Sequence, residues 1–188
     1  MKDLVMHNVT LSGISPIMFD RYPGENETTL PPREKMYFAA DGKTVVMPCH
    51  NIYAMLGSNF RDCATKRKYG KQHGKYTTAT QGFIDITPLE IAFLRDGNPI
   101  EFHEFGEDGF VIDRSTARVK KSASQLIPNP VTRPILKLPW SLQLGVTIIP
   151  NDLLNEDCVR QLFTIGGLYI GIGSWRGRFG KFEVESWE

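Results

Sequence analysis

Residues 166–184 combine the residue types that could hold the backbone of a nucleic acid. The segment contains six glycines, four aromatic residues and three cations. Glycine lets another backbone or a ligand approach closely, arginine and lysine pair with phosphate, and aromatic rings offer stacking faces for bases. The alternative is a glycine-kinked edge strand with solvated arginines. The expected contacts in this segment are Gly173, Ser174, Arg176, Arg178 and Lys181.

The spacing within this segment makes the expectation specific. Glycines that follow a helix leave the backbone free to turn several N–H groups toward a phosphate. Arg176 and Arg178 lie two residues apart, so both are expected on one face of an extended chain. Trp175 and Phe179 are then expected to face the core or a neighbouring subunit.

A second cationic run spans residues 61–76, with six Lys or Arg residues against the single acid Asp62. Tyr69 and Tyr76 are interleaved with the cations, a pattern typical of grooves that hold single strands. The alternative is a solvated helix end whose lysines complement the helix dipole. The expected phosphate contacts here are Arg61, Lys66, Arg67, Lys68, Lys71 and Lys75.

Residues 114–122 form a third patch, which has four cations and no acid. Hydroxyl and cationic side chains together suit phosphate contact, and Arg114, Arg118 and Lys120 are the candidates. The alternative is an exposed strand edge that lysines protect against aggregation.

The sequence contains no complete motif for a phosphate-binding loop or for a histidine metal site. Gly42-Lys43-Thr44 lacks the glycine that a phosphate-binding loop needs five residues earlier, where Tyr37 stands. The four histidines have no carboxylate or cysteine partner at ligand spacing, so no metal and no cofactor are expected. His50 and Asn51 stand at an expected helix start beside the groove and are candidate RNA contacts. Only His50 has even a weak claim to catalysis, as a general base.

Composition indicates an ordinary globular chain. The 188 residues are 41% hydrophobic and 23% charged, with a net charge of +1, so a nucleic-acid site must be a local patch. Three cysteines without a CxxC motif argue against a disulfide framework and a zinc cluster, and favour a reducing cytoplasm. The sequence has neither a signal-peptide core nor an apolar run that approaches a membrane span.

Periodicity and turn residues predict an alternation of strands and helices. Asn155 is expected to cap the second helix and Gly166 to end it. Asp96-Gly97 is expected to form a hairpin turn into residues 100–105. The predicted elements are a strand over 5–19 bent near Gly13 or Pro16, a loop over 20–36, a short strand over 44–47, a helix over 49–64, a flexible polar segment over 65–82, strands over 83–95 and 110–121, an irregular connection over 128–139, a strand over 140–149, a helix over 155–165 and a closing strand or hairpin.

Reduced to its strongest elements, the chain is an α+β protein with a ferredoxin-like β-α-β-β-α-β core, insertions and a C-terminal glycine-rich loop. The same core is the RNA-recognition (RRM-like) platform. We expect a single domain over 1–188, with candidate inserted arms at 65–82 and 105–125.

Three segments together resemble the RAMP superfamily, the RNA-binding subunits of CRISPR effector complexes. Residues 10–16 are similar to its opening strand, residues 45–56 to its strand, proline and helix element, and residues 166–182 to its glycine-rich loop and closing strand. Residues 49–53 read Cys-His-Asn-Ile-Tyr where the family usually has Ser-Ser-Leu-Lys-Gly, which weakens the transfer of guide-RNA contacts.

The resemblance implies a non-catalytic cytoplasmic subunit of an antiviral ribonucleoprotein. Such a subunit would bind guide or target RNA, with single-stranded DNA as another possible strand, and would assemble with copies of itself or with other effector subunits. Two alternatives stay open. One is a metal-independent RNA-processing endonuclease of the same superfamily, with His50 as general base and Arg176 stabilising the phosphate. The other is a phage structural or inhibitor protein without an RNA ligand.

Overall fold

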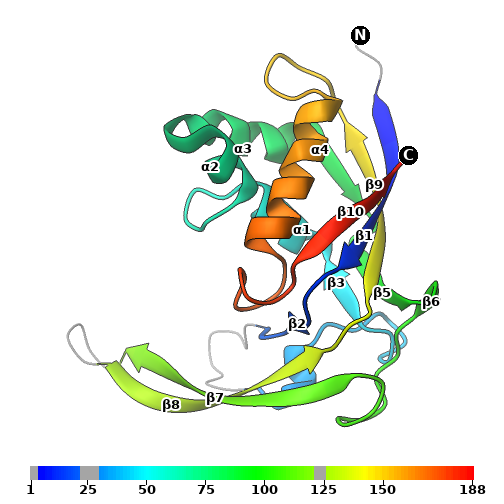
Figure 1. The fold of residues 1–188 in the computed structure, drawn as a ribbon, viewed down its shortest axis with the longest axis vertical. Helices are drawn as coiled ribbons and strands as arrows, with labels where there is room; N and C mark the ends of the chain where they lie inside the picture. Colours follow the sequence, from blue (N-terminus) through cyan, green and yellow to red (C-terminus); the bar gives the residue numbers. More distant parts are fainter. Residues whose placement is uncertain (1–3, 22–29, 121–125) are drawn as a thin grey trace.

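An antiparallel sheet forms the centre of the molecule, which is known from a computed structural model describing residues 4–21, 30–120 and 126–188. The strand order is β10-β1-β9-β5-β3, with β4 beside β9 and β6 beside β5 (Figure 1). The strands of this sheet are β1 (Val5–Gly13), β3 (Val46–Pro48), β4 (Ile84–Thr87), β5 (Glu90–Arg95), β6 (Asn98–Pro99), β9 (Ser141–Ile148) and β10 (Phe182–Trp187).

The strand predicted over 140–149 is confirmed as β9, which lies at the centre of the sheet. In β9, Leu142, Leu144, Val146 and Ile148 are buried and the residues between them are more exposed, because successive side chains of a strand point to opposite faces. The single strand predicted over 5–19 is divided in two at the predicted bend, because Ile17–Met18 belongs to another sheet. β1 ends at Gly13, where a Cβ atom would overlap the buried Trp140 ring.

Four helices cover one face of this sheet (Figure 1): α1 (Cys49–Leu56), α2 (Ala64–Tyr69), α3 (His73–Phe83) and α4 (Glu156–Ile165). α4 confirms the helix predicted over 155–165. Its residues Val159, Leu162 and Phe163 are fully buried at helical spacing. The Asn155 Oδ1 atom accepts a hydrogen bond from the Cys158 amide at 2.8 Å, which caps the helix as expected.

A second sheet consists of β2 (Ile17–Met18), β7 (Phe110–Lys120) and β8 (Leu126–Leu136). β7 and β8 form a long hairpin that extends away from the helices (Figure 1). β7 confirms the extended piece predicted over 110–121. The irregular connection predicted over 128–139 is wrong, because most of it is β8.

The prolines of β8 explain how a strand forms there. Pro128, Pro130 and Pro134 lie opposite alternate residues of β7, so their backbones point to the same side. The Pro134 carbonyl accepts from the Phe19 amide at 2.9 Å, which identifies that side as the one facing away from β7. The N–H groups that these prolines lack are therefore not needed by the β7–β8 ladder.

Several predicted boundaries are wrong for local reasons. The helix predicted over 49–64 ends at Leu56, and Gly57 packs so closely on α3 that a Cβ would overlap the Thr80 hydroxyl oxygen. The segment over 65–82 is helical rather than flexible, and the side chains it buries include Thr65, Thr77 and Ala79. Gly166 does not end its helix, which continues as a π turn over Gly166–Ile170.

The connection between α3 and the second sheet also differs in detail. The strand predicted over 83–95 is divided into β4 and β5 at Pro88. Asp96 and Gly97 form the predicted turn, both with positive φ, at 51° and 78°. The partner strand is the short β6, and residues 100–105 contribute only a bridge between Thr44 and Glu101.

Candidate nucleic-acid interface

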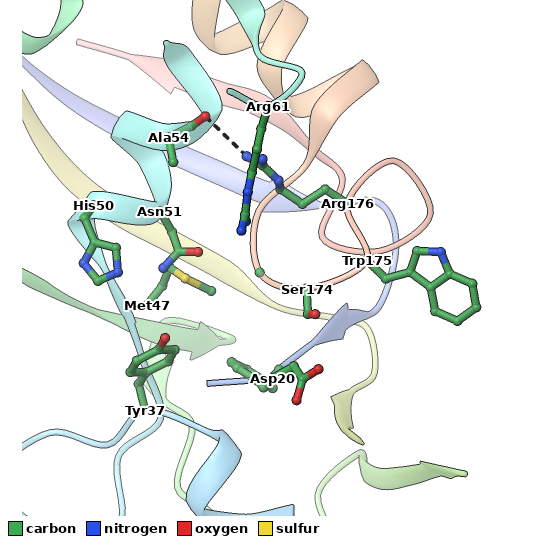
Figure 2. Close-up of a pocket in the computed structure, with 12 residues that line it drawn as sticks. Asp20, Tyr37, Met47, His50, Asn51, Ala54, Arg61, Ser174, Trp175 and Arg176 are labelled. Atoms are coloured by element: carbon green, nitrogen blue, oxygen red, sulfur yellow. Dashed lines mark hydrogen bonds between the residues drawn. The ribbon is translucent and has the colours of Figure 1, made fainter. Parts of the chain in front are cut away.

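A cavity of about 420 Å³ lies between the start of α1, the loop over 57–63 and the glycine-rich loop over 171–181 (Figure 2). We call it the arginine pocket. It brings together parts of two predicted cationic segments that are far apart in the sequence. Six predicted contacts line it: His50, Asn51, Arg61, Gly173, Ser174 and Arg176. The remaining lining residues are Phe19, Asp20, Tyr37, Met47, Ala54 and Trp175.

α1 forms the first wall. Pro48 precedes the helix with an extended backbone, and Ile52, Met55 and Leu56 anchor one side of the helix in the core. His50 and Asn51 occupy the first turn, which carries no acidic residue. The positive end of the helix dipole therefore meets the pocket and favours an anion there.

The glycine-rich loop forms the second wall and is held by its own backbone. The amides of Gly171, Ile172, Ser174, Gly177 and Gly180 donate to backbone carbonyls of the protein at 2.7–3.0 Å. These N–H groups already have hydrogen-bond partners within the protein and are not free to bind a phosphate. The expectation that the loop turns several of its amides toward a phosphate is wrong at these positions.

Two of the loop glycines are required by close approach and by left-handed backbone. Gly173 has φ +77°, and a Cβ there would lie 2.7 Å from the Met18 carbonyl oxygen. Gly180 has φ +70°, and its Cβ would overlap the Ile172 carbonyl oxygen. The glycines thus pack the loop against β2 and against itself, and they present Ser174, Trp175 and Arg176 at the pocket.

Two arginines dominate the charge of the pocket. The Arg61 and Arg176 guanidinium groups lie side by side in Figure 2. Arg176 is partly buried and donates from Nη1 to the Ala54 carbonyl at 3.3 Å, near the C-terminal end of α1. Burial and the neighbouring Arg61 charge lower the pKa of Arg176. An arginine remains protonated at neutral pH, so the pair presents two positive charges that repel each other.

The one carboxylate on the pocket wall is engaged elsewhere. Asp20 accepts from Arg133 Nε at 2.7 Å, and its other oxygen lies 3.4 Å from Lys35 Nζ. This carboxylate is thereby compensated by two cations that do not line the pocket. In the described part of the chain, neither pocket arginine has a carboxylate partner within salt-bridge distance. The pocket can therefore accept an anion such as phosphate.

The rest of the second predicted patch lies outside the pocket. Lys66 Nζ donates to the Asn59 and Arg61 carbonyls at 2.8 and 2.9 Å. Arg67 Nε donates to an Asp62 oxygen at 2.9 Å. Lys68 Nζ donates to Gln161, Lys75 lies over the Tyr76 ring, and Lys71 is exposed. Among these cations, Arg67 also lines a neighbouring cavity together with Arg176.

The third predicted patch belongs to the hairpin and is separate from the pocket. Arg114 is exposed on β7 and lines a groove at the base of the hairpin with Lys35 and Ser115. Arg118 and Lys120 also belong to β7, but their side chains lie outside the described part of the structure.

Arg176 and Arg178 do not share a face. Arg176 points into the pocket, whereas the Arg178 guanidinium lies over the Trp175 and Phe179 rings, 5.4 and 5.9 Å from their centroids. The prediction assumed an extended chain, but the segment turns, and the Phe179 amide donates to the Trp175 carbonyl at 3.3 Å. Lys181 is half-buried, and its amide donates to the Ser15 hydroxyl at 2.9 Å.

The sequence analysis missed Tyr37 and Trp175 as pocket residues. Tyr37 lies between the loop predicted over 20–36 and the strand predicted over 44–47, where no element was predicted. Burial raises the pKa of Tyr37, which favours the neutral phenol. Trp175 was expected to turn toward the core or a partner, yet it is half exposed with its indole directed away from the pocket (Figure 2). The sequence offered one indication that Trp175 lies at the pocket, because it directly precedes the predicted contact Arg176.

The described residues lack both a metal cluster and a membrane-spanning helix. They contain no group of three or more His, Cys, Asp or Glu side chains that could hold a metal ion. None of the described helices is long and apolar enough to cross a membrane.

Comparison with known proteins gives a structural likeness. No protein-family model matches the chain, and neither does any curated protein. A similar solved structure is a chain of the type III-B Cmr-beta complex bound to cognate target RNA, determined by cryo-EM. The TM-score is 0.57 at 14% sequence identity, and the match covers 98% of this chain and 60% of that chain. At this identity the likeness shows a shared fold.

Proposed function

We propose that the chain is a non-catalytic RNA-binding subunit of a CRISPR-type ribonucleoprotein. The observation that carries the proposal is the arginine pocket, where two guanidinium groups have no carboxylate partner among the described residues and share the cavity with His50 and Asn51 of the first turn of α1. A phosphate of an RNA backbone would neutralise this charge. The RNA-bound Cmr-beta neighbour adds support from the fold.

The order of the strands supports membership of the RAMP superfamily. Taken along the chain, β1, α1, β4 with β5, β9, α4 and β10 form a β-α-β-β-α-β series. In the sheet, β1 lies between β10 and β9, and β9 lies between β1 and the β4–β5 pair, an order that supports a ferredoxin-like core. We treat residues 1–188 as one domain, with the β7–β8 hairpin as an inserted arm.

The open face of the sheet argues against the usual mode of RRM domains, which stack bases on aromatic residues of the central strands. On β1 and β9 the side chains opposite the helices are non-aromatic: Met6, Asn8, Thr10, Ser12, Ser141, Gln143 and Thr147. We therefore assign RNA to the arginine pocket. The cations of α2, α3 and the hairpin remain predicted contacts along the same strand.

Binding through this pocket should be electrostatic and tolerant of sequence, because guanidinium groups recognise phosphate and not base identity. The test measures the affinity for several unrelated unstructured RNAs over a range of salt concentrations. We expect similar affinities that fall linearly with the logarithm of salt concentration. A failure of the folded protein to bind any of the RNAs would refute the proposal and favour a protein ligand.

The second candidate is RNA cleavage, favoured by one observation: His50 lines the same pocket as both arginines. A general base is usually oriented by a hydrogen bond to a further group. In the described part of the chain, the His50 side chain makes no such bond, so the proposal assigns it to binding. Labelled RNA should stay intact with or without Mg²⁺. Specific cleavage that is lost in His50→Ala would replace the binding proposal with an endonuclease.

A further inference from the structure

Trp175 adopts a backbone conformation that is unusual for a bulky residue. Its φ is +48° and its side chain is 52% exposed. Left-handed backbone at an aromatic residue persists only where the surroundings enforce it, and such residues gather at functional sites. Here the Ser174 amide donates to Met18, and the Phe179 amide donates to the Trp175 carbonyl, so both flanks are fixed.

The indole is supported on one side and open on the other. The Arg178 guanidinium lies 5.4 Å from its ring centroid, and the Phe179 ring lies 5.9 Å away at an angle of 44°. These neighbours fix the orientation of the indole beside the pocket while the rest of its surface stays in water. An aromatic ring held rigidly and partly exposed next to a cationic site suits stacking on a planar ligand.

A second exposed ring stands beside the other pocket arginine. Phe60 is 98% exposed and directly precedes Arg61. The Ser58 hydroxyl accepts the amides of Phe60 and Arg61 at 3.3 and 3.1 Å. Lys66 donates to carbonyls on both sides of Phe60, as described above. These hydrogen bonds therefore hold the loop in a conformation that leaves the Phe60 ring exposed to solvent.

We propose that Trp175 and Phe60 stack on the bases that flank the phosphate held by Arg61 and Arg176, so that the pocket selects single strands. The inference rests on the proposed RNA-binding function and specifies its ligand. Bases of a duplex are already paired and stacked, whereas those of a single strand can be splayed onto aromatic rings. Each arginine of the pocket would hold the backbone while its neighbouring ring holds a base.

The test compares Trp175→Ala, Phe60→Ala and the unaltered protein on three labelled probes. These are an unstructured RNA, a strand of the same length with abasic sites, and the corresponding duplex. We expect each alanine variant to bind the unstructured RNA roughly 5- to 150-fold more weakly, from the usual value of base stacking. The abasic strand and the duplex should bind the unaltered protein more weakly and be insensitive to either substitution.

The controls separate stacking from folding and from the proposed function itself. Trp175→Phe, which keeps an aromatic face, should retain most of the affinity. Phe83→Ala removes a ring that is 38% exposed and lines neither the pocket nor the neighbouring cavity beside Arg176, and should change nothing. Equal losses on the unstructured and abasic strands would overturn the stacking role, as would equal affinity for duplex and single strand. Absence of binding by the unaltered protein would instead refute the RNA-binding function.

Discussion

Removal of the two pocket arginines is the most direct perturbation of the proposed site. Arg61 is exposed, and in the described part of the chain its side chain makes no hydrogen bond, so Arg61→Ala should alter the free energy of unfolding by less than about 0.5 kcal/mol. Arg176→Ala removes the bond to the Ala54 carbonyl, which is worth about 0.5–1.5 kcal/mol. Relief of the repulsion between the two guanidinium groups offsets part of that loss. The double variant should therefore fold.

The loss of affinity should be much larger than the loss of stability. A hydrogen bond to a charged group contributes about 1.5–3 kcal/mol, which corresponds to roughly 10- to 150-fold in the dissociation constant for each arginine. The salt dependence gives a second quantity. If both arginines bind one phosphate, the slope of log affinity against log salt should flatten by about 0.7; with two phosphates the change should be about 1.4.

Fluorescence anisotropy with labelled unstructured RNA over a salt series measures both quantities in one experiment. Arg160→Ala is the matched control, because Arg160 is an exposed arginine of α4 that does not line the pocket. It removes one positive charge, as each single pocket variant does, and should leave the slope nearly unchanged. A folded Arg61→Ala, Arg176→Ala double variant with the slope of the unaltered protein would refute the assignment of phosphate to this pocket.

Further predictions concern the fold that holds the site. Gly180→Ala should destabilise the protein by several times more than Gly177→Ala, since both have positive φ but only the first would place a Cβ against backbone; thermal unfolding compares them. Tyr53→Phe should cost about 1–3 kcal/mol in chemical denaturation, because the hydroxyl joins the Ile84 carbonyl and the Ile86 amide, at 3.1 and 3.0 Å. Burial raises the pKa of Tyr37, Tyr53 and Tyr69, so folding favours the neutral phenols. Stability should be complete below about pH 10 and fall as the pH rises further, which denaturation at about pH 8 and about pH 11 would measure.

The parts of the fold that could be predicted are those with a clean apolar period. β9 alternates and α4 repeats its large apolar residues at helical spacing, so both were found with nearly correct boundaries. α2 and α3 were missed because their buried residues, among them Ala64, Thr65 and Thr77, are small or carry hydroxyls. Thr65 and Thr77 satisfy each other through a hydroxyl contact of 2.8 Å, which no periodicity of hydrophobic residues can reveal.

The candidate site was predictable in its residue types but not in its geometry. Cationic and glycine-rich segments supplied Arg61 and Arg176, and the helix start supplied His50 and Asn51, all of which line one pocket. The separation of Arg176 from Arg178 could not be predicted, because it depends on a turn that places Trp175 at positive φ. The turn is held in part by a tertiary hydrogen bond, from the Ser174 amide to the Met18 carbonyl of β2, which the local sequence does not reveal.

The structure changes the role that the sequence predicts for Lys66. The sequence predicts a phosphate contact, and neutralising such a contact should flatten the salt slope by about 0.7. The structure favours a positioning residue, because its ammonium group already donates to the Asn59 and Arg61 carbonyls. Lys66→Met should then weaken RNA binding with little change of slope.

Two further variants decide between these roles of Lys66. Ser58→Ala removes the hydroxyl that accepts the Phe60 and Arg61 amides without altering charge, so it should reproduce the loss of affinity caused by Lys66→Met. Lys137→Met removes an exposed lysine that is not a predicted RNA contact and does not line the pocket, and it serves as the charge control. If Lys66→Met flattens the slope by about 0.7 while Ser58→Ala leaves affinity unchanged, the ammonium group contacts phosphate directly and the loop needs no such support.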